Sequence, residues 1–335
     1  MKKEAELLLA WYEKNGRDLP WRVRGKAHPD PYAVWVSEIM LQQTTVKTVC
    51  DYFDRWMKRF PTLQTLAEAS LDDVLHQWQG LGYYTRAKKM HACALYLQEH
   101  FNGKFPPDRT QLLTLPGIGP YTASSLCAFA FNMPETVIDG NVIRVLSRYY
   151  GITGIVERKN IEPYAAPLTP QESAADYASA IMDLGATVCT PTAPQCHSCP
   201  WEQLCTAHSR HLEEKIPQLK KTVKKKKKGA LFILYSPDHK LFIRKRPGQG
   251  LLSGLWEVPW HGEMTFPFEA KWQEIPGKVR HIFTHFELEL RFFTTASPLP
   301  EEFAASGIFV PAEELSQYAF STLMKKALKE LKIFT

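Results

Sequence analysis

Four of the seven cysteines lie close together in the chain, in the order Cys189, Cys196, Cys199 and Cys205. In a reducing compartment, thiolates spaced this closely indicate metal binding more often than disulfide bonding. Structural zinc sites usually contain paired C-x2-C modules with longer separations. Four cysteines in one compact loop can instead close around a single iron–sulfur cluster. The spacing therefore favours an iron–sulfur cluster, with zinc as the alternative.

A glycine-containing segment, LPGIGPYTASS at 115–125, is predicted to join the end of one helix to the start of the next. Gly117 and Gly119 permit a tight turn and the close approach of a ligand. The unpaired N–H groups and the positive dipole end of the following helix suit an anion such as a phosphate. A plain connection between two helices explains the same residues, so both interpretations remain open from this motif alone.

Two carboxylates have types and positions that suit acid chemistry. Glu38 lies in SEIMLQQTT (37–45), a mostly apolar stretch where a buried acid is costly, although a solvated helix position is its ordinary interpretation. Asp139 precedes a predicted helix in VIDGNVIRVL (137–146), where an N-cap is the ordinary role. As a pair they fit the acid and the stabilising carboxylate of glycosidic-bond cleavage through an oxocarbenium-like state.

These residues must be positioned by the secondary-structure elements of a chain of 335 residues. This length exceeds the roughly 100–200 residues of one domain, so we expect two domains. The 44% hydrophobic and 23% charged content exclude wholesale disorder. No apolar run approaches the roughly 18 residues that a membrane helix needs. Glu4 and Glu6 interrupt a short apolar start that does not resemble an export signal, so we expect a cytoplasmic protein.

The net charge of +6 is concentrated in one segment, because seven lysines lie within 220–228 and the rest of the chain is close to neutral. Charge alone therefore identifies neither half as a nucleic-acid binder. A run of like charges this dense does not pack against a core. The sequence predicts a solvated, lysine-rich linker over residues 211–228.

The two sides of this linker show different periodicities. Apolar residues recur at three- and four-residue steps in 4–13, 32–60 and 140–150, which predicts an all-helical domain over 1–210. After the lysine run, 231–236, 240–246 and 286–293 are predicted strands and 312–332 a predicted helix. The second domain, 229–335, is therefore expected to be α+β, which makes the whole chain mainly α.

Several motifs occur in one order, and their combination is specific: DLPWR (18–22), PYAVWVSEIMLQQT (31–44), GLGYYTRA (80–87), LPGIGPYTA (115–123), IDGNVIRVL (138–146) and MDLGA (182–186), followed by the four cysteines. Together they resemble the helix–hairpin–helix DNA glycosylases that carry a [4Fe–4S] cluster, and among these the MutY-type adenine glycosylases. The resemblance implies excision of adenine opposite 8-oxoguanine or guanine in double-stranded DNA, by a monomer, in base excision repair. It also implies that the four cysteines hold the cluster.

The resemblance assigns roles to the residues that could carry out the reaction. Glu38 protonates adenine N7, Asp139 stabilises the developing sugar cation, and Asn141 helps to hold the site. Tyr121 stands where related enzymes that also cleave the DNA backbone have a Schiff-base lysine. Because imine chemistry requires a lysine amine as the nucleophile, we expect a monofunctional glycosylase that leaves an abasic site.

Other residues match positions that recognise DNA in these glycosylases. Ser179 stands where relatives have glutamine or glutamate near the adenine, so the contact with that edge of the base is left open to water or to another side chain. The remaining matches fall in the adenine pocket, in the segment that wedges into the base stack around the opposite guanine, and in the hairpin: Arg17, Trp21, Arg22, Gln43, Thr44, Leu81, Tyr83, Gly117 and Gly119.

The segment RKRPGQGLLSGLWEVPW (244–260) resembles the Nudix-like C-terminal domain of the same glycosylases. A Nudix hydrolase needs a glutamate-rich helix that binds magnesium, and the glutamates of this region are scattered. Recognition is therefore the expected role of the domain. Phe283, Thr284 and His285 stand where the family has a Phe-Ser-His loop that contacts 8-oxoguanine, and threonine keeps the hydroxyl group.

Three other functions compete with this prediction. A bifunctional glycosylase and lyase acting on pyrimidine lesions belongs to the same superfamily, but Tyr121 and the extra domain disfavour it. A non-catalytic DNA-binding iron–sulfur protein is disfavoured because Glu38 and Asp139 are both present. A Nudix-type pyrophosphatase is disfavoured by the lack of its glutamate helix.

Overall fold

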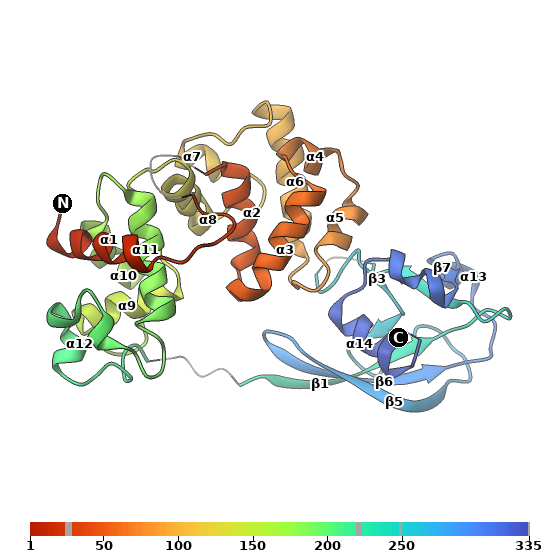
Figure 1. Cartoon of the computed structure of the whole chain (residues 1–335). Coiled ribbons are helices and arrows are strands. Elements are labelled where there is room, and N and C mark those ends of the chain that lie inside the picture. The colour runs from red at the N-terminus through yellow and green to blue at the C-terminus, as the bar shows by residue number, and fades with distance from the viewer. Residues whose placement is uncertain (24–28, 219–222, 248–249, 334–335) are drawn as a thin grey trace. The chain divides into compact units, whose positions relative to one another are not determined.

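A computed structural model describes residues 1–23, 29–218, 223–247 and 250–333. The chain folds as two compact units (Figure 1), of which the first contains 1–68 and 92–221 and the second contains 69–91 and 222–335. The second unit therefore includes a segment of the N-terminal half, which the sequence did not predict. In the described residues, no helix is long and apolar enough to cross a membrane.

The first unit is helical, as predicted, and its described residues contain no strand. α6 (Thr85–His100) runs from the second unit into the first. The other helices are α1 (Lys3–Asn15), α2 (Pro31–Leu41), α3 (Val46–Arg59), α4 (Leu63–Glu68), α7 (Arg109–Leu112), α8 (Pro120–Ser125), the π-helix Leu126–Ala130, α9 (Gly140–Tyr150), α10 (Arg158–Ala165), α11 (Ala174–Thr187), α12 (Thr206–Ser209) and three short 3-10 helices, Ala166–Leu168, Cys196–Ser198 and Glu202–Leu204.

The single helical stretch expected over 32–60 is two helices, because the chain turns between α2 and α3. Asp30 caps α2 by accepting a hydrogen bond from the Tyr32 backbone N–H, and proline suits the first helical position. After α2, Gln43 has a φ of +66°, a left-handed conformation that no helix continues. Residues 42–45 are polar, but Val46 follows Ile39 by seven residues, two helical turns, so the helical phase is kept and the sequence did not reveal the turn.

The core of the first unit lies where α1, α9 and α11 pack together. The contact between α9 and α11 is close, because a Cβ atom at Gly185 would lie only 2.6 Å from the Cβ atom of Asn141. Glycine at this position of the MDLGA motif therefore lets α11 approach the start of α9. This approach brings residues of the two helices to one cavity.

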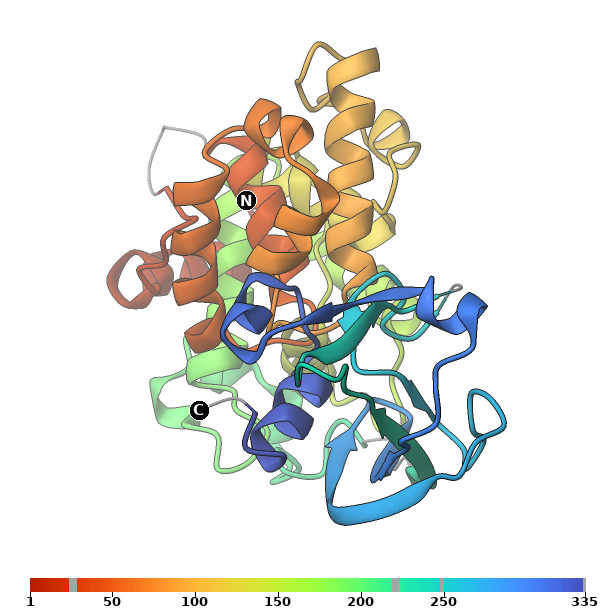
Figure 2. The same cartoon turned by 90° about the vertical axis from the view of Figure 1, so that its right-hand side faces the viewer.

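The second unit is α+β, as predicted, and Figures 1 and 2 show α14 beside its larger sheet. That sheet has the order β4-β1-β6-β5, in which only β1 and β6 are parallel, and the smaller sheet has the order β3-β2-β7. The elements are α5 (Leu71–Gln77), β1 (Lys225–Ile233), β2 (Leu241–Lys245), β3 (Trp256–Glu257), β4 (Trp260–His261), β5 (Gln273–Ile282), β6 (Phe286–Thr294), α13 (Glu301–Ala304), β7 (Gly307–Val310), the 3-10 helix Ala312–Gln317 and α14 (Thr322–Glu330).

The linker expected over 211–228 is shorter than predicted at both ends. Ile216 is buried and its carbonyl accepts a hydrogen bond from Arg148, so the described part of 211–218 packs in the first unit. At the other end, Lys225–Lys228 form the beginning of β1. Pairing uses only their backbone, so the like charges stay in solvent while the strand forms. Residues 220–222 of the lysine run lie outside the described residues.

The helix expected over 312–332 is interrupted. The 3-10 helix ends at Gln317, and α14 begins only at Thr322, where Ser321 accepts a hydrogen bond from the Met324 backbone N–H as an N-cap. Phe320, which lies in the interruption, is fully buried in the core of the unit. Burial of this side chain against the sheet explains why the helical period breaks here.

Candidate active site

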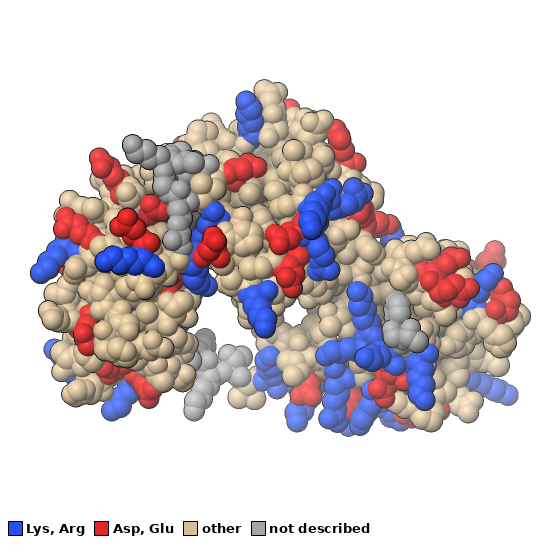
Figure 3. All heavy atoms as spheres, in the orientation of Figure 1, with Lys and Arg blue, Asp and Glu red and all other residues tan. Residues whose placement is uncertain are grey.

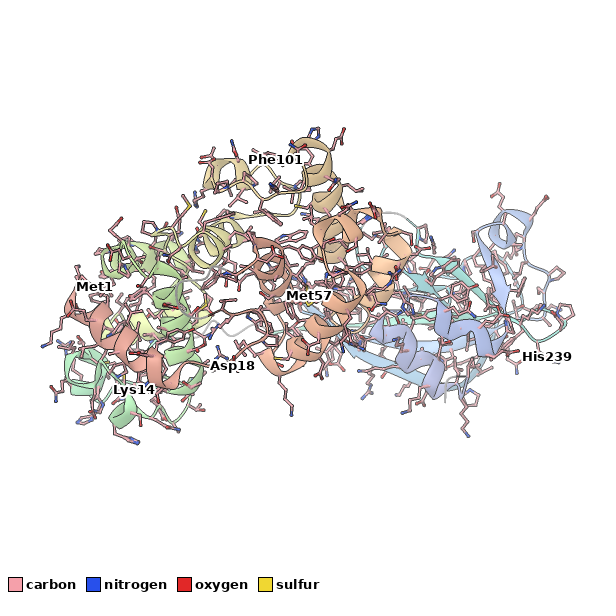
Figure 4. The ribbon with its side chains drawn as sticks, turned by 45° about the horizontal axis from the view of Figure 1, so that its top comes forward. Met1, Lys14, Asp18, Met57, Phe101 and His239 are labelled. Carbon is pink, nitrogen blue, oxygen red and sulfur yellow. The ribbon has the colours of Figure 1, made fainter. Side chains whose placement is uncertain are left out.

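A cavity of about 200 Å³ in the first unit contains most of the predicted catalytic and adenine-contact residues. The segment between α1 and α2, marked by Asp18 in Figure 4, carries its arginines and Trp21. The other predicted residues come from α2 and the turn after it, from α9 and its N-cap, and from α11. The predicted residues that line the cavity are Arg17, Trp21, Arg22, Glu38, Thr44, Asp139, Asn141 and Ser179.

Glu38 lies on α2, whose neighbouring side chains are almost all apolar and buried. Only 7% of its surface is exposed. The pKa of this carboxyl is raised to about 7, mainly by burial and also by the negative charge of Asp139, while Ser125, Tyr121 and Arg22 act in the opposite direction. Glu38 can therefore hold a proton near neutral pH, as a general acid must.

Asp139 caps α9, so its ordinary interpretation is correct, but its carboxylate also faces the cavity. One oxygen accepts a hydrogen bond of 2.8 Å from the Val142 backbone N–H, and the other accepts one of 2.8 Å from the Asn141 side chain. The Asn141 oxygen in turn accepts from Arg144 at 2.8 Å. Because both its oxygens are engaged, the carboxylate is fixed in orientation.

Tyr121 lies on α8, directly after the glycine-containing hairpin. Burial and the negative charges of Glu38 and Asp139 raise the pKa of its phenol well above the ordinary value, so the hydroxyl stays protonated. In the hairpin, Gly117 has a φ of +81°, which favours glycine. A Cβ atom at Gly119 would meet no atom within 4 Å, so the backbone here is open to a ligand.

The arginines of the cavity are held by Asp183, a residue of the MDLGA motif whose role the sequence did not reveal. Its side chain is fully buried on α11 and accepts hydrogen bonds from the backbone N–H and Nε of Arg17, at 2.8 and 2.7 Å. Both terminal nitrogens of Arg22 also donate to it, at 2.7 and 2.9 Å. Burial alone would raise the pKa of Asp183, but these arginines lower it below the ordinary value.

The four clustered cysteines line one cavity in the first unit, and none of the seven cysteines forms a disulfide bond. The side chain of Arg148 is buried there and donates hydrogen bonds to Cys189 Sγ at 3.3 Å and to the Thr190 carbonyl at 2.7 Å. A cation beside the sulfurs stabilises thiolates and an anionic cluster bound by them. Four convergent thiols with a cationic donor fit an iron–sulfur group.

This cavity also contains a second possible set of ligands. Cys196, His208 and Glu213 have ligand atoms within 4.8 Å of one another, and His208 Nδ1 lies 2.6 Å from a Glu213 oxygen. A mixed sulfur, nitrogen and oxygen set is typical of zinc. The geometry therefore shows a cysteine-rich site whose residues could hold a metal, and the convergence of all four thiols favours the cluster over a single ion.

The cysteine loop is connected through α9 to the cavity that contains Glu38 and Asp139. Arg144, whose side chain binds Asn141, also donates from Nε to the Cys189 carbonyl at 2.8 Å. Hydrogen bonds therefore run from Asp139 through Asn141 and Arg144 to the first cysteine of the loop. Neither arginine was predicted, because nothing in the local sequence indicates where their side chains end.

Five of the residues predicted to recognise the opposite guanine line a second cavity, of about 580 Å³, within the second unit. The hydroxyl groups of Tyr83 and Thr284 are hydrogen-bonded to each other there. Gln43 lines neither of these two cavities and is exposed in the turn after α2. The five residues are Leu81, Tyr83, Phe283, Thr284 and His285.

Comparison with known proteins agrees with these two units. Residues 36–171 match the HhH-GPD superfamily of base excision DNA repair proteins, and residues 230–330 match the NUDIX domain. A solved thermostable thymine-DNA glycosylase is 26% identical, with a TM-score of 0.56, and the match covers 62% of this chain and 95% of that one. An endonuclease III–DNA complex, 22% identical with a TM-score of 0.52, shares the fold. The first unit is therefore a helix–hairpin–helix DNA glycosylase domain.

Individual relatives narrow this class. The adenine DNA glycosylase of Rattus norvegicus is 33% identical over 96% of this chain and 76% of its own length. That of Buchnera aphidicola subsp. Acyrthosiphon pisum is 37% identical over 76% of this chain and 73% of its own length. The human adenine DNA glycosylase is 33% identical over 96% of this chain and 72% of its own length. The chain belongs to the adenine DNA glycosylases, which are DNA N-glycosylases of base excision repair.

Proposed function

We propose that this protein removes adenine mispaired with 8-oxoguanine or guanine in double-stranded DNA by hydrolysing the bond between adenine and its sugar. The observation that carries the proposal is a buried Glu38, with a pKa of about 7, in one cavity with Asp139. An acid and a carboxylate with different environments are what this hydrolysis needs. The adenine must leave the base stack to enter the cavity, because the bond is unreachable inside a duplex.

In the proposed reaction, protonated Glu38 donates its proton to adenine N7. The bond between C1′ and N9 then breaks, and its electron pair leaves with the neutral base. The Asp139 carboxylate stabilises the positive charge that develops on the sugar, and Asn141 keeps that carboxylate in orientation. Water adds to C1′ and loses a proton, which leaves an abasic site.

We further propose that the protein does not cleave the DNA backbone. Tyr121 offers a phenol that stays protonated, and a phenol cannot form the imine on which a lyase reaction depends. Its hydrogen bond with Glu38 and the nearby charge of Asp139 suit a positioning role beside the sugar.

Recognition of the opposite base is assigned to the cavity of the second unit. A base can stack on aromatic groups such as Phe283 and Tyr83, and the Thr284 hydroxyl can donate or accept a hydrogen bond. We further propose that the protein acts as a monomer and, because its substrate is double-stranded DNA, that it acts at the nucleoid in the cytoplasm.

Single-turnover release of adenine tests this function. Duplexes with A·8-oxoguanine, A·G and A·C pairs are compared, and we expect the fastest release from the first. Strand breaks should appear only after alkali, because the product is an abasic site. Thr284→Val removes the hydroxyl and keeps the shape, so we expect it to narrow the preference for A·8-oxoguanine over A·G. Release from none of the duplexes, or breaks without alkali, would contradict the proposal.

We also propose that Cys189, Cys196, Cys199 and Cys205 hold a [4Fe–4S] cluster, with Arg148 beside its sulfur ligands. When bound, such a cluster crosslinks the loop between α11 and α12 and supplies redox chemistry. Anaerobically purified protein should show broad absorption near ~400 nm and contain about four iron atoms per chain. Cys199→Ser should lose this absorption and unfold at a lower temperature, whereas Cys93→Ser, at a buried thiol outside the loop, should keep the absorption. One zinc ion per chain and no iron would overturn the assignment.

A further inference from the structure

The lysine run is the most concentrated positive charge in the chain, and its described part forms an exposed strand. Lys225–Lys228 are all exposed and pair with Phe286–Glu289 of β6. β4 pairs with β1 only at Ala230 and Leu231, so within the described residues the lysine end of β1 has a strand on one side only. Figure 3 shows Lys and Arg side chains gathered over the strands of this unit.

Successive side chains of a strand point to opposite faces, which separates these lysines into two pairs. Lys225 pairs with Phe286, and Lys227 Nζ lies 5.1 Å from the centre of the Phe286 ring, so these two share the face of Phe286. Lys226 and Lys228 occupy the other face, beside Glu287 and Glu289. The two pairs carry equal charge but have different neighbours.

The face of β1 with Lys225 and Lys227 lies beside the cavity of the second unit to which recognition of the opposite base was assigned, the recognition cavity. Phe286 lines that cavity, and its ring lies 4.8 Å from the ring of Phe283. Lys227 therefore contacts a residue of the cavity wall. In the described residues, none of these four lysines forms an ion pair, and Glu289 is paired with Lys278 and Arg280. The two faces differ in their cross-strand neighbours, because Lys226 and Lys228 lie beside the carboxylates of Glu287 and Glu289, whereas Lys225 and Lys227 lie beside apolar residues. The positive charge beside the cavity is thus left for an external anion.

We propose that Lys225 and Lys227 bind phosphates of the DNA backbone next to the base held in the recognition cavity, an inference that rests on the proposed function. An ammonium group on a flexible stem binds a phosphate as a point charge and carries no sequence information. Each phosphate contact releases counterions, so the contact makes binding depend on salt. It adds affinity for any duplex and leaves the choice of base to the cavity.

Salt-dependent DNA binding tests this assignment. Lys225→Gln/Lys227→Gln is compared with the matched control Lys226→Gln/Lys228→Gln, which removes the same charge from the opposite face. All proteins carry Glu38→Gln so that the substrate stays intact. The dissociation constant is measured from 50 to 200 mM salt on A·8-oxoguanine and undamaged duplexes. The salt slope is the change in the logarithm of affinity with the logarithm of salt concentration, and we expect it to be less steep by about 2 for the first variant on both duplexes. Across this range, the variant should therefore lose roughly tenfold less affinity than the parent protein. The control should change the slope by much less.

Two outcomes would overturn the proposal. Equal slopes in both variants would mean that the lysines act as diffuse charge and that neither face contacts the backbone. Slopes that stay unchanged in both variants would mean that the lysines do not bind DNA and only prevent the edge of β1 from pairing with a strand of another molecule. Failure of the proposed function is separate, because it would appear as no preference of the parent protein for the A·8-oxoguanine duplex, while the slopes on undamaged DNA still test the lysines.

Discussion

Replacing Glu38 with glutamine is expected to slow adenine release by about 10²–10⁴-fold, the usual contribution of a positioned general acid. Adenine is a poor leaving group unless it is protonated, and Glu38 is the buried acid of the cavity with a pKa of about 7. Glutamine has nearly the same shape and can form hydrogen bonds, but it has no acidic proton to donate. Single-turnover kinetics on an A·8-oxoguanine duplex measure the loss without interference from slow product release.

The pH dependence of the same rate identifies the group that donates the proton. Because the acid form of Glu38 is the reactive one, the rate should be highest below its pKa and fall about tenfold per pH unit above a midpoint near 7. In Glu38→Gln the small remaining rate should lack this descending limb. A limb that persists in the variant would assign the proton to another group.

Stability provides the control for this variant. The pKa of Glu38 is raised from 4.5 in the unfolded chain to about 7, so its burial destabilises the folded state progressively as pH rises from about 4.5 to about 7. Glutamine carries no charge to bury at any of these pH values. Compared with the parent protein, Glu38→Gln should therefore be relatively more heat-stable at pH 8 than at pH 5. Slow release by a protein that unfolds earlier at both pH values would point to misfolding.

The sequence predicted those parts of the site whose chemistry is visible in single residues. Four closely spaced cysteines, and an acid in an apolar helix, are unusual enough to stand out, and the fold brings Glu38 and Asp139 to one cavity. Asp183 did not stand out, because its partners Arg17 and Arg22 are more than 160 residues away in the chain. A carboxylate that meets its arginines only after folding leaves no local pattern.

For the fold as well, the sequence predicted the features that depend on neighbouring residues and missed those that depend on residues far away in the chain. Periodicity predicted the helical half and the strands, because it records which face of each element is buried. It did not reveal the turn at Gln43, because the apolar residues resume after the break in the same helical phase. It also assigned Lys225–Lys228 to a linker, because the pairing of their backbone with β6 depends on a strand about 60 residues later.

Asp183 leads to the second large prediction, that Asp183→Asn destabilises the first unit and impairs adenine release together. Breaking a buried ion pair by removing one partner costs about 3–5 kcal/mol, because the other charge stays buried without compensation. Here two arginines lose their carboxylate, and the side chains of Arg17 and Arg22 are only 26% and 13% exposed. Both arginines line the catalytic cavity, so we expect release to slow by about 10²-fold even where the variant is fully folded.

The second unit offers a matched control for this prediction. Glu257 is a buried carboxylate held between Arg244 and Arg246, at 3.2 and 2.8 Å, and none of the three lines the catalytic cavity. Glu257→Gln removes the same type of charge from a similar pair of arginines. We expect it to lower the unfolding temperature while leaving the single-turnover rate of the folded protein within about twofold. Circular dichroism sets a temperature at which both variants are folded, and single-turnover release is measured there. Equal slowing by the two variants would mean that Asp183 acts only through stability, whereas slowing by Asp183→Asn alone identifies it as the residue that positions the arginines of the adenine pocket.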